Sequence, residues 1–147
     1  YSSAAGLTSE GGCLACPAGS ACSLGATAAT ECAAGSFSDS EGAADCTSCV
    51  AGTFQGSMGQ QSCETCTAGG YCREGSVAPT LCTAGRYSGN EGNVQQDQCE
   101  TCQPGEFSPV GSVAPSPCAT GTYSNVQEAA TCTACSAGKY MDVEGST

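Results

Sequence analysis

The 147-residue sequence is poor in the large apolar side chains from which globular cores are built. It has four Leu, seven Val and no Ile, and its aromatic residues are three Phe, five Tyr and no Trp. Ordering a residue costs about 1–2 kcal/mol of backbone entropy, and burial of small side chains such as Ala offsets little of that cost. A single globule with an apolar core is therefore excluded, which leaves a disordered chain or one held by covalent cross-links.

Positive charge is also scarce, since three Lys and Arg stand against 14 acidic residues, for a net charge of −11. Nucleic acids and anionic membranes both require basic surfaces, so neither is an expected partner. No run of 18 apolar residues is present, and we expect no membrane insertion by this segment. Histidine, the commonest general base, is absent, and no glycine-rich loop ends in Lys-Ser or Lys-Thr. The sequence therefore predicts no enzyme and no cofactor.

The chain instead has 15 cysteines, about one residue in ten, a share that is typical of disulfide scaffolds. Disulfides persist in oxidising compartments, so secretion or the cell surface is the expected location. Asn-x-Ser/Thr acceptor sequences are absent, whereas Ser and Thr are abundant. We therefore expect no N-glycan, and we hypothesise that O-glycans decorate the surface.

The cysteines follow an internal repeat of 16 to 20 residues that begins Cys-x-x-Gly-x-aromatic. We call these three positions the lead cysteine, the first glycine and the ring, and we name each repeat by the number of its lead cysteine. A second glycine follows the ring by four or five residues, and Glu128 replaces it once. Seven repeats fill residues 16–134, with starts at Cys16, Cys32, Cys49, Cys66, Cys82, Cys102 and Cys118. Residues 1–15 are predicted to end one further repeat and residues 135–147 to start another, so we expect a window on a longer array.

The repeats end in two ways. Four of them end in Cys-x-x-Cys, in which the first residue is a closing cysteine and the second is the next lead cysteine. Repeats 16, 66 and 102 lack a closing cysteine and end directly at the next lead cysteine. Two of these three have an extra cysteine directly after the ring position, Cys22 and Cys72, whereas the third has Ser108 there.

Two disulfide schemes fit these spacings, because spacing alone never proves connectivity. In the local scheme each lead cysteine pairs inside its own repeat. The pairs are Cys32–Cys46, Cys49–Cys63, Cys82–Cys99, Cys118–Cys132, Cys16–Cys22 and Cys66–Cys72. Cys13 would then bond upstream and Cys135 downstream of the window, and Cys102 is left over. The crossed scheme pairs Cys63 with Cys72 and Cys49 with Cys66, as in interleaved modules.

The paired Cys-x-x-Cys motifs also allow a metal interpretation. Cys46/Cys49 and Cys63/Cys66 resemble a zinc ribbon, although 13 residues separate the two pairs instead of 15–20. Because three repeats lack a closing cysteine, a set of four cysteine ligands does not recur regularly along the chain. Repeat disulfides are therefore the favoured interpretation, and no metal is expected.

The same pattern predicts the fold. The Gly-x-aromatic step indicates a short strand after a turn, and the second glycine indicates a chain reversal. We expect a small disulfide-rich fold, mostly irregular with short β-hairpins, in which the rings pack on disulfides and no large hydrophobic core forms. No 3.6-residue apolar period predicts a helix. We expect each repeat to contact only its neighbour, so the array is predicted to be an elongated rod.

The runs Cys-Pro-Ala-Gly at 16–19 and Cys-Thr-Ala-Gly-Arg-Tyr-Ser at 82–88, with the Cys-x-x-Cys closures, resemble ephrin-receptor-like cysteine-rich repeats. These repeats are similar in style to tumour-necrosis-factor-receptor and EGF-like modules. The resemblance covers nearly the whole chain. It implies a receptor ectodomain or a very large surface protein of a protist, such as those of flagellar hairs (mastigonemes), and the Ala, Ser, Thr and Gly bias resembles the fibre group.

Two functional hypotheses follow, and neither gives any residue a catalytic role. The first is an extracellular structural protein whose repeats build a filament, stalk or surface appendage. Its partners would be further copies in a fibre or neighbouring repeats of a longer chain. The second is a rod-like spacer in a receptor or adhesin that binds a protein or glycan ligand. A fibre predicts more of the same repeat and self-association, whereas a receptor predicts a separate ligand domain and an anchor.

Overall fold

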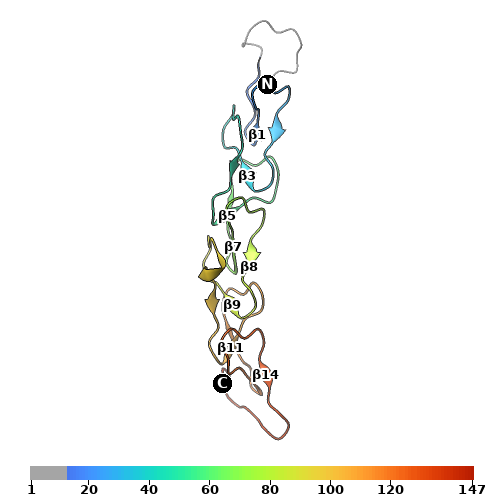
Figure 1. Ribbon diagram of the computed structural model, residues 1–147. Coiled ribbons are helices and arrows are strands. Elements are labelled where there is room, and N and C mark those ends of the chain that lie inside the picture. The colour runs from blue at the N-terminus through green and yellow to red at the C-terminus, as the bar shows by residue number, and fades with distance from the viewer. Residues whose placement is uncertain (1–12) are drawn as a thin grey trace. The chain divides into compact units, whose positions relative to one another are not determined.

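The computed structural model describes residues 13–147, and the repeat fragment predicted in residues 1–12 lies outside them. Seven two-stranded antiparallel hairpins follow one another in the described part (Figure 1). Its one helical element is a short 3₁₀ turn, η2 (Gln96–Gln98). The prediction of a disulfide-rich, mostly irregular fold with short β-hairpins is confirmed.

Each hairpin lies within one repeat, and its two strands flank the loop that contains the second glycine. The strand pairs are β1 (Ser20–Ala21) with β2 (Thr30–Glu31), β3 (Ser36–Phe37) with β4 (Thr47–Ser48), β5 (Thr53–Phe54) with β6 (Glu64–Thr65), β7 (Gly70–Tyr71) with β8 (Thr80–Leu81), β9 (Arg86–Tyr87) with β10 (Glu100–Thr101), β11 (Glu106–Phe107) with β12 (Ser116–Pro117), and β13 (Thr122–Tyr123) with β14 (Thr133–Ala134). The ring position always faces the residue two places before the next lead cysteine. All seven hairpins therefore share one register.

A glycine turn precedes the first strand of each hairpin. In repeat 32 the Ser36 N–H donates to the carbonyl oxygen of Ala33 at 3.0 Å. Gly35, the third residue of this turn, has a φ of 84°. A positive φ at that place is what a type II turn requires, so glycine is the residue that fits there.

Backbone hydrogen bonds join each repeat to the next. Gly42 N–H donates to the carbonyl oxygen of Cys16 at 2.7 Å, and Gly19 N–H donates to that of Ser38 at 2.8 Å. The first bond recurs with the second glycine or Glu128 as donor: Gly59 to Cys32, Gly75 to Cys49, Gly92 to Cys66, Gly111 to Cys82, Glu128 to Cys102 and Gly145 to Cys118. Because these bonds use main-chain groups alone, they do not depend on which side chains a repeat carries.

The first glycine also approaches the repeat after the next one. A Cβ atom on Gly19 would overlap the carbonyl oxygen of Gly59, and one on Gly69 would overlap that of Gly111. The same overlap with a residue two repeats on is found at Gly35, Gly85 and Gly105. The expectation that contacts reach only the neighbouring repeat is therefore wrong. The missing side chain of the first glycine lets the main chains of alternate repeats meet.

The contacts divide the chain into two compact units. One consists of the residues up to Thr65 together with Arg73–Ala78, and the other of Cys66–Cys72 together with Pro79–Thr147. The division passes through repeat 66, because its hairpin loop bonds to repeat 49 whereas its two strands bond to each other. A single repeat is thus not an independent folding unit, as is usual in arrays stabilised by contacts between repeats.

Most of the buried apolar side chains in the described part are cysteines. The lead cysteines of all seven repeats are at most 2% exposed. The cluster of buried apolar residues in the described part consists of Tyr71, Cys82 and Cys99. Since Cys82 and Cys99 form a disulfide, the ring of repeat 66 packs on the cross-link of the repeat that follows it.

Candidate functional site: the cysteine framework

Six disulfides cross-link the described residues, and each of them closes within one repeat. They join Cys16 to Cys22, Cys32 to Cys46, Cys49 to Cys63, Cys66 to Cys72, Cys82 to Cys99 and Cys118 to Cys132. The Cα atoms of each pair lie 5.6–6.0 Å apart, a separation that a disulfide spans without backbone movement. These pairs have the spacings of the local scheme, and neither pair of the crossed scheme is present among these residues.

A lead cysteine reaches its partner in one of two ways. In four repeats the partner is the closing cysteine, 14 or 17 residues on, beyond the hairpin loop. In repeats 16 and 66 the partner is 6 residues on, directly after the ring position. Ala29 and Pro79 stand where those two repeats would have a closing cysteine. The lead cysteine of such a repeat has no partner beyond the loop and bonds to the nearer one.

Repeat 102 has neither partner, because Pro115 stands at the closing position and Ser108 stands after the ring. Cys102 is consequently a free thiol, and both it and Ser108 are fully buried. The two side chains form a hydrogen bond, with Cys102 Sγ 2.8 Å from Ser108 Oγ. A thiol enclosed in this way is shielded from reagents, as buried structural cysteines usually are.

Cys13 and Cys135 are the other two free cysteines of the described residues. Cys13 is exposed and Cys135 is partly buried. Both are more exposed than the buried Cys102, so they are the free thiols more accessible for bonds to further protein. The assignment of such bonds remains a prediction of the local scheme.

The zinc alternative conflicts with this framework. Cys46, Cys49, Cys63 and Cys66 are all engaged in disulfides. Zinc is bound by thiolates, and a disulfide sulfur has no thiolate to offer. No group of three or more potential metal-ligating side chains comes together in residues 13–147.

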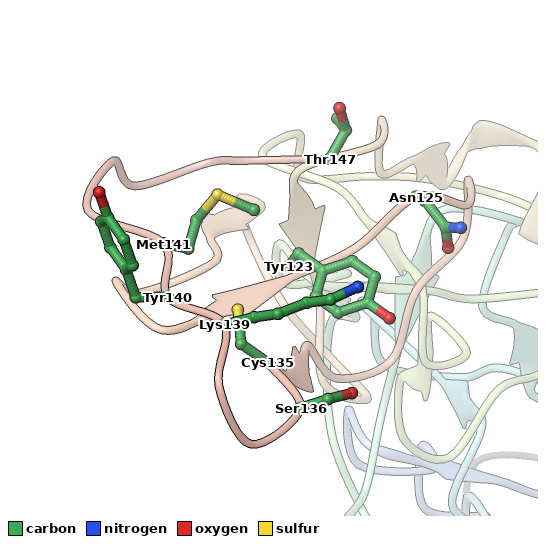
Figure 2. A pocket seen from close by; sticks show the side chains of 8 residues that line it. All are labelled: Tyr123, Asn125, Cys135, Ser136, Lys139, Tyr140, Met141 and Thr147. Carbon is green, nitrogen blue, oxygen red and sulfur yellow. The ribbon is translucent and has the colours of Figure 1, made fainter.

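A concave site near the C-terminal end has a volume of about 290 Å³. Tyr123, Lys139 and Tyr140 are among the residues that line it (Figure 2). The remaining lining residues are Asn125, Cys135, Ser136, Met141 and Thr147. No carboxylate or histidine lines this hollow.

The sequence profile of a family described as tyrosine-protein kinase ephrin type A/B receptor-like matches residues 35–74 and 105–147. These two segments together make up more than half of the chain. The chain belongs to the ephrin-receptor-like family of cysteine-rich repeats. The resemblance seen in the sequence motifs is thereby confirmed. No curated protein matches the chain.

Ephrin-receptor-like repeats are a non-catalytic, structural type of domain that is found in extracellular proteins. The disulfides fit that setting, because such bonds form and persist in oxidising compartments. Within the part of the chain that the structure describes, no helix has the length and hydropathy to cross a membrane.

The ephrin-receptor-like repeats 82 and 118 are also linked by a side-chain pair that the sequence patterns do not predict. Arg86 Nη2 forms an ion pair with Glu128 Oε1 at 2.6 Å. Glu128 occupies the place of the second glycine with a φ of 57°, an unfavourable conformation for a residue with a side chain. Its carboxylate makes a contact that glycine could not make.

A second polar pair lies on the hairpin of repeat 82. Tyr87 Oη donates to Glu100 Oε2 at 3.0 Å across the strands β9 and β10. This hydrogen bond to the carboxylate, helped by partial burial, raises the pKa of the Tyr87 hydroxyl above its ordinary value. The tyrosine therefore stays protonated at all physiological pH values and acts as a hydrogen-bond donor.

Proposed function

We propose that this chain is a structural segment of an extracellular protein, in which disulfide-stapled repeats build a filament, stalk or surface appendage such as a flagellar hair. The six disulfides and the family membership support an extracellular setting. The composition supports a fibre, because Ala, Ser, Thr and Gly predominate and large apolar side chains are few. The proposal includes secretion or display at the cell surface and no enzymatic activity.

One observation carries the proposal more than any other. In every one of the seven repeats, the lead-cysteine carbonyl accepts a hydrogen bond from the hairpin loop of the following repeat. The last such bond runs from Gly145 to Cys118, so even the incomplete repeat at residues 135–147 follows the rule. An interface built from main-chain groups can be repeated many times without a matching set of side chains. This property suits a long array and is not required of a compact binding domain.

Electron microscopy of the native protein, without reducing agent, tests the proposal. Long filaments with a regular axial repeat are expected, and a reducing agent is expected to disperse them because it opens the disulfides that hold each repeat. Separate short particles or monomers in native material would contradict the structural role. Reductant-resistant filaments would contradict the part assigned to the disulfides.

The family match favours a second candidate, since the profile is named for receptors. In that case the repeats would serve as a spacer in the ectodomain of a receptor or adhesin. Binding would then reside in another domain or in one irregular repeat, of which repeat 82 with η2 is the clearest example. Saturable binding of a protein or glycan by the intact protein, with no filaments in the same preparation, would favour this candidate.

A further inference from the structure

One hydroxyl position recurs on the second strand of the hairpins. It lies two residues before the next lead cysteine, and five of the seven hairpins have Thr or Ser there. We call these residues the strand-two hydroxyls: Thr30, Thr47, Thr80, Ser116 and Thr133. All five are exposed, and none of their hydroxyl groups makes a hydrogen bond with another described residue. The other two hairpins have Glu64 and Glu100 at this position.

Three hydroxyls on the first strands behave differently. Ser36 Oγ and Thr53 Oγ1 each donate to the carbonyl oxygen three residues earlier at 2.8 Å, and Thr122 Oγ1 does so at 2.7 Å. We call these three residues the turn hydroxyls. They add a side-chain bond to the glycine turn, a local role that is common for Ser and Thr. The strand-two hydroxyls have no such role in folding, so their oxygen atoms are free to react.

The shared register places each strand-two hydroxyl opposite the ring position. Thr47 faces Phe37, Ser116 faces Phe107 and Thr133 faces Tyr123. Directly paired residues in an antiparallel sheet have their Cβ atoms about 4.5–5.5 Å apart and project to the same face. These three rings are partly exposed, so a free hydroxyl and an uncovered aromatic surface lie side by side in each of these hairpins.

A partly exposed ring beside a free hydroxyl suits a covalently attached sugar. The flat faces of a pyranose carry C–H bonds with partial positive charge, and the face of an aromatic ring is negative. A sugar on the hydroxyl would cover the ring and remove its apolar surface from water. Two of the seven hairpins allow comparison, since Thr30 faces Ala21, which has no ring, and Thr80 faces Tyr71, whose ring is already buried.

We propose that the strand-two hydroxyls are the acceptor sites for O-linked sugars, and that the first sugar packs on the ring of the opposite strand where that ring is exposed. In the transfer step the hydroxyl oxygen attacks the anomeric carbon of a nucleotide-activated sugar. The bond from that carbon to the diphosphate breaks, the nucleoside diphosphate leaves, and the hydroxyl proton passes to a base of the transferase. The inference rests on the extracellular location in the proposed function, because such transferases act on proteins of the secretory pathway.

Site-resolved mass spectrometry of glycopeptides from the native protein tests the proposal. Sugar is expected at the strand-two hydroxyls, with at least several-fold lower occupancy at the turn hydroxyls. Thr67 is a useful reference, since it is exposed but belongs to no strand pair. Absence of sugar at the strand-two hydroxyls would overturn the proposal. Equal occupancy at Thr67 and at the turn hydroxyls would overturn it as well, because position in the hairpin would then be irrelevant.

Matched variants separate the site from the fold. Thr47→Val in the secreted protein is expected to remove the mass of one glycan, whereas Thr53→Val is expected to leave the glycan mass unchanged. Both changes keep a β-branched side chain in a strand, and an unchanged non-reducing peptide map shows that the disulfides have formed. Retention of the full glycan mass in Thr47→Val would overturn the assignment of this site.

A nuclear magnetic resonance measurement tests the packing of the sugar on the ring. Protons of the sugar on Thr133 are expected to shift upfield through the ring current of Tyr123, whereas those on Thr30 are expected to show no such shift. Equal shifts at both sites would overturn the packing. Filaments without sugar at these positions would refute this inference and leave the structural role intact, and sugar without filaments would do the reverse.

Discussion

Repeats 66 and 102 differ in the partner of their lead cysteine. Both have the sequence Gly-Ser-Val-Ala-Pro in the hairpin loop, at 75–79 and 111–115. Repeat 66 closes its first turn with the Cys66–Cys72 disulfide, whereas in repeat 102 the same place holds a hydrogen bond between Cys102 and Ser108. One repeat is cross-linked and the other is not, yet both form the same hairpin.

The stacking bonds of the two repeats explain why the hairpin survives without the cross-link. Gly75 N–H donates to Cys49 at 2.8 Å, and Gly111 N–H donates to Cys82 at 2.9 Å. The loop is therefore held by the preceding repeat in both cases. A disulfide stabilises chiefly by restricting the unfolded chain. It follows that the disulfide adds stability to a conformation which the stacking already specifies.

The largest expected effect comes from a side chain at the first glycine. Gly69→Ala and Gly105→Ala would both place a Cβ atom on a carbonyl oxygen two repeats on. Gly75→Ala is the control, since its φ of 70° is also in the left-handed region and its Cβ would meet nothing. The control substitution is expected to lower the free energy of unfolding by about 1–2 kcal/mol because of the left-handed conformation alone. The other two substitutions are expected to lower it by clearly more. Urea unfolding of the three variants measures these differences in the free energy of unfolding. If Gly105→Ala were as mild as the control, repeat 102 would not stack as repeat 66 does.

The next effect is the removal of the short cross-link. Cys72→Ser gives repeat 66 the residue that repeat 102 has after its ring. The expected loss in free energy of unfolding is about 2 kcal/mol for a loop of this length. A thiol titration in denaturant should find one free cysteine more than the three of the unchanged protein. Loss of the whole fold, rather than a reduced midpoint, would show that the stacking bonds are insufficient in repeat 66.

The reverse change should supply the missing cross-link. Ser108→Cys is expected to form a disulfide with Cys102 and to raise stability by up to about 2 kcal/mol, less if the bond is strained. Ser88→Cys is the control, because its lead cysteine is already bonded to Cys99. A non-reducing peptide map should show the new pair in the first variant alone. The same map separates the local from the crossed scheme, since a peptide containing Cys63 bonded to Cys72 would contradict the local pairing.

The smallest effect concerns the hydrogen bond that replaces the disulfide. Ser108→Ala leaves the buried thiol of Cys102 without its partner and is expected to cost about 1 kcal/mol. Ser48→Ala, in an exposed position without a side-chain bond, is expected to change stability by less than about 0.5 kcal/mol. Equal thermal midpoints for the two variants would show that the Cys102–Ser108 contact contributes nothing.

The hairpins could be predicted from the sequence because their determinants are local. A glycine three residues after the lead cysteine, a ring two residues later and a second glycine in the loop mark turn, strand and reversal within about 17 residues. The absence of a large core was equally predictable, because no arrangement of so few Leu, Val and Phe residues could build one. The family, too, could be recognised from these short motifs.

The glycine contacts could not be predicted in the same way. Gly69 and Gly111 are far apart in sequence, and no pattern within one repeat indicates that a repeat touches the second one after it. The pairing of Arg86 with Glu128 is a further example. The sequence shows only that Glu128 departs from the glycine pattern, and the structure adds the partner that makes the departure tolerable.

The sequence by itself determined the class of this protein: an acidic, disulfide-stapled array of short hairpins without a large apolar core. These properties follow from composition and from motifs shorter than one repeat. Only the tertiary structure decided which backbone groups join the repeats, why the first glycine admits no side chain, and which hydroxyls remain free beside a ring. The physical reason is that these features depend on the stacking of repeats, in which atoms about 40 residues apart come into contact.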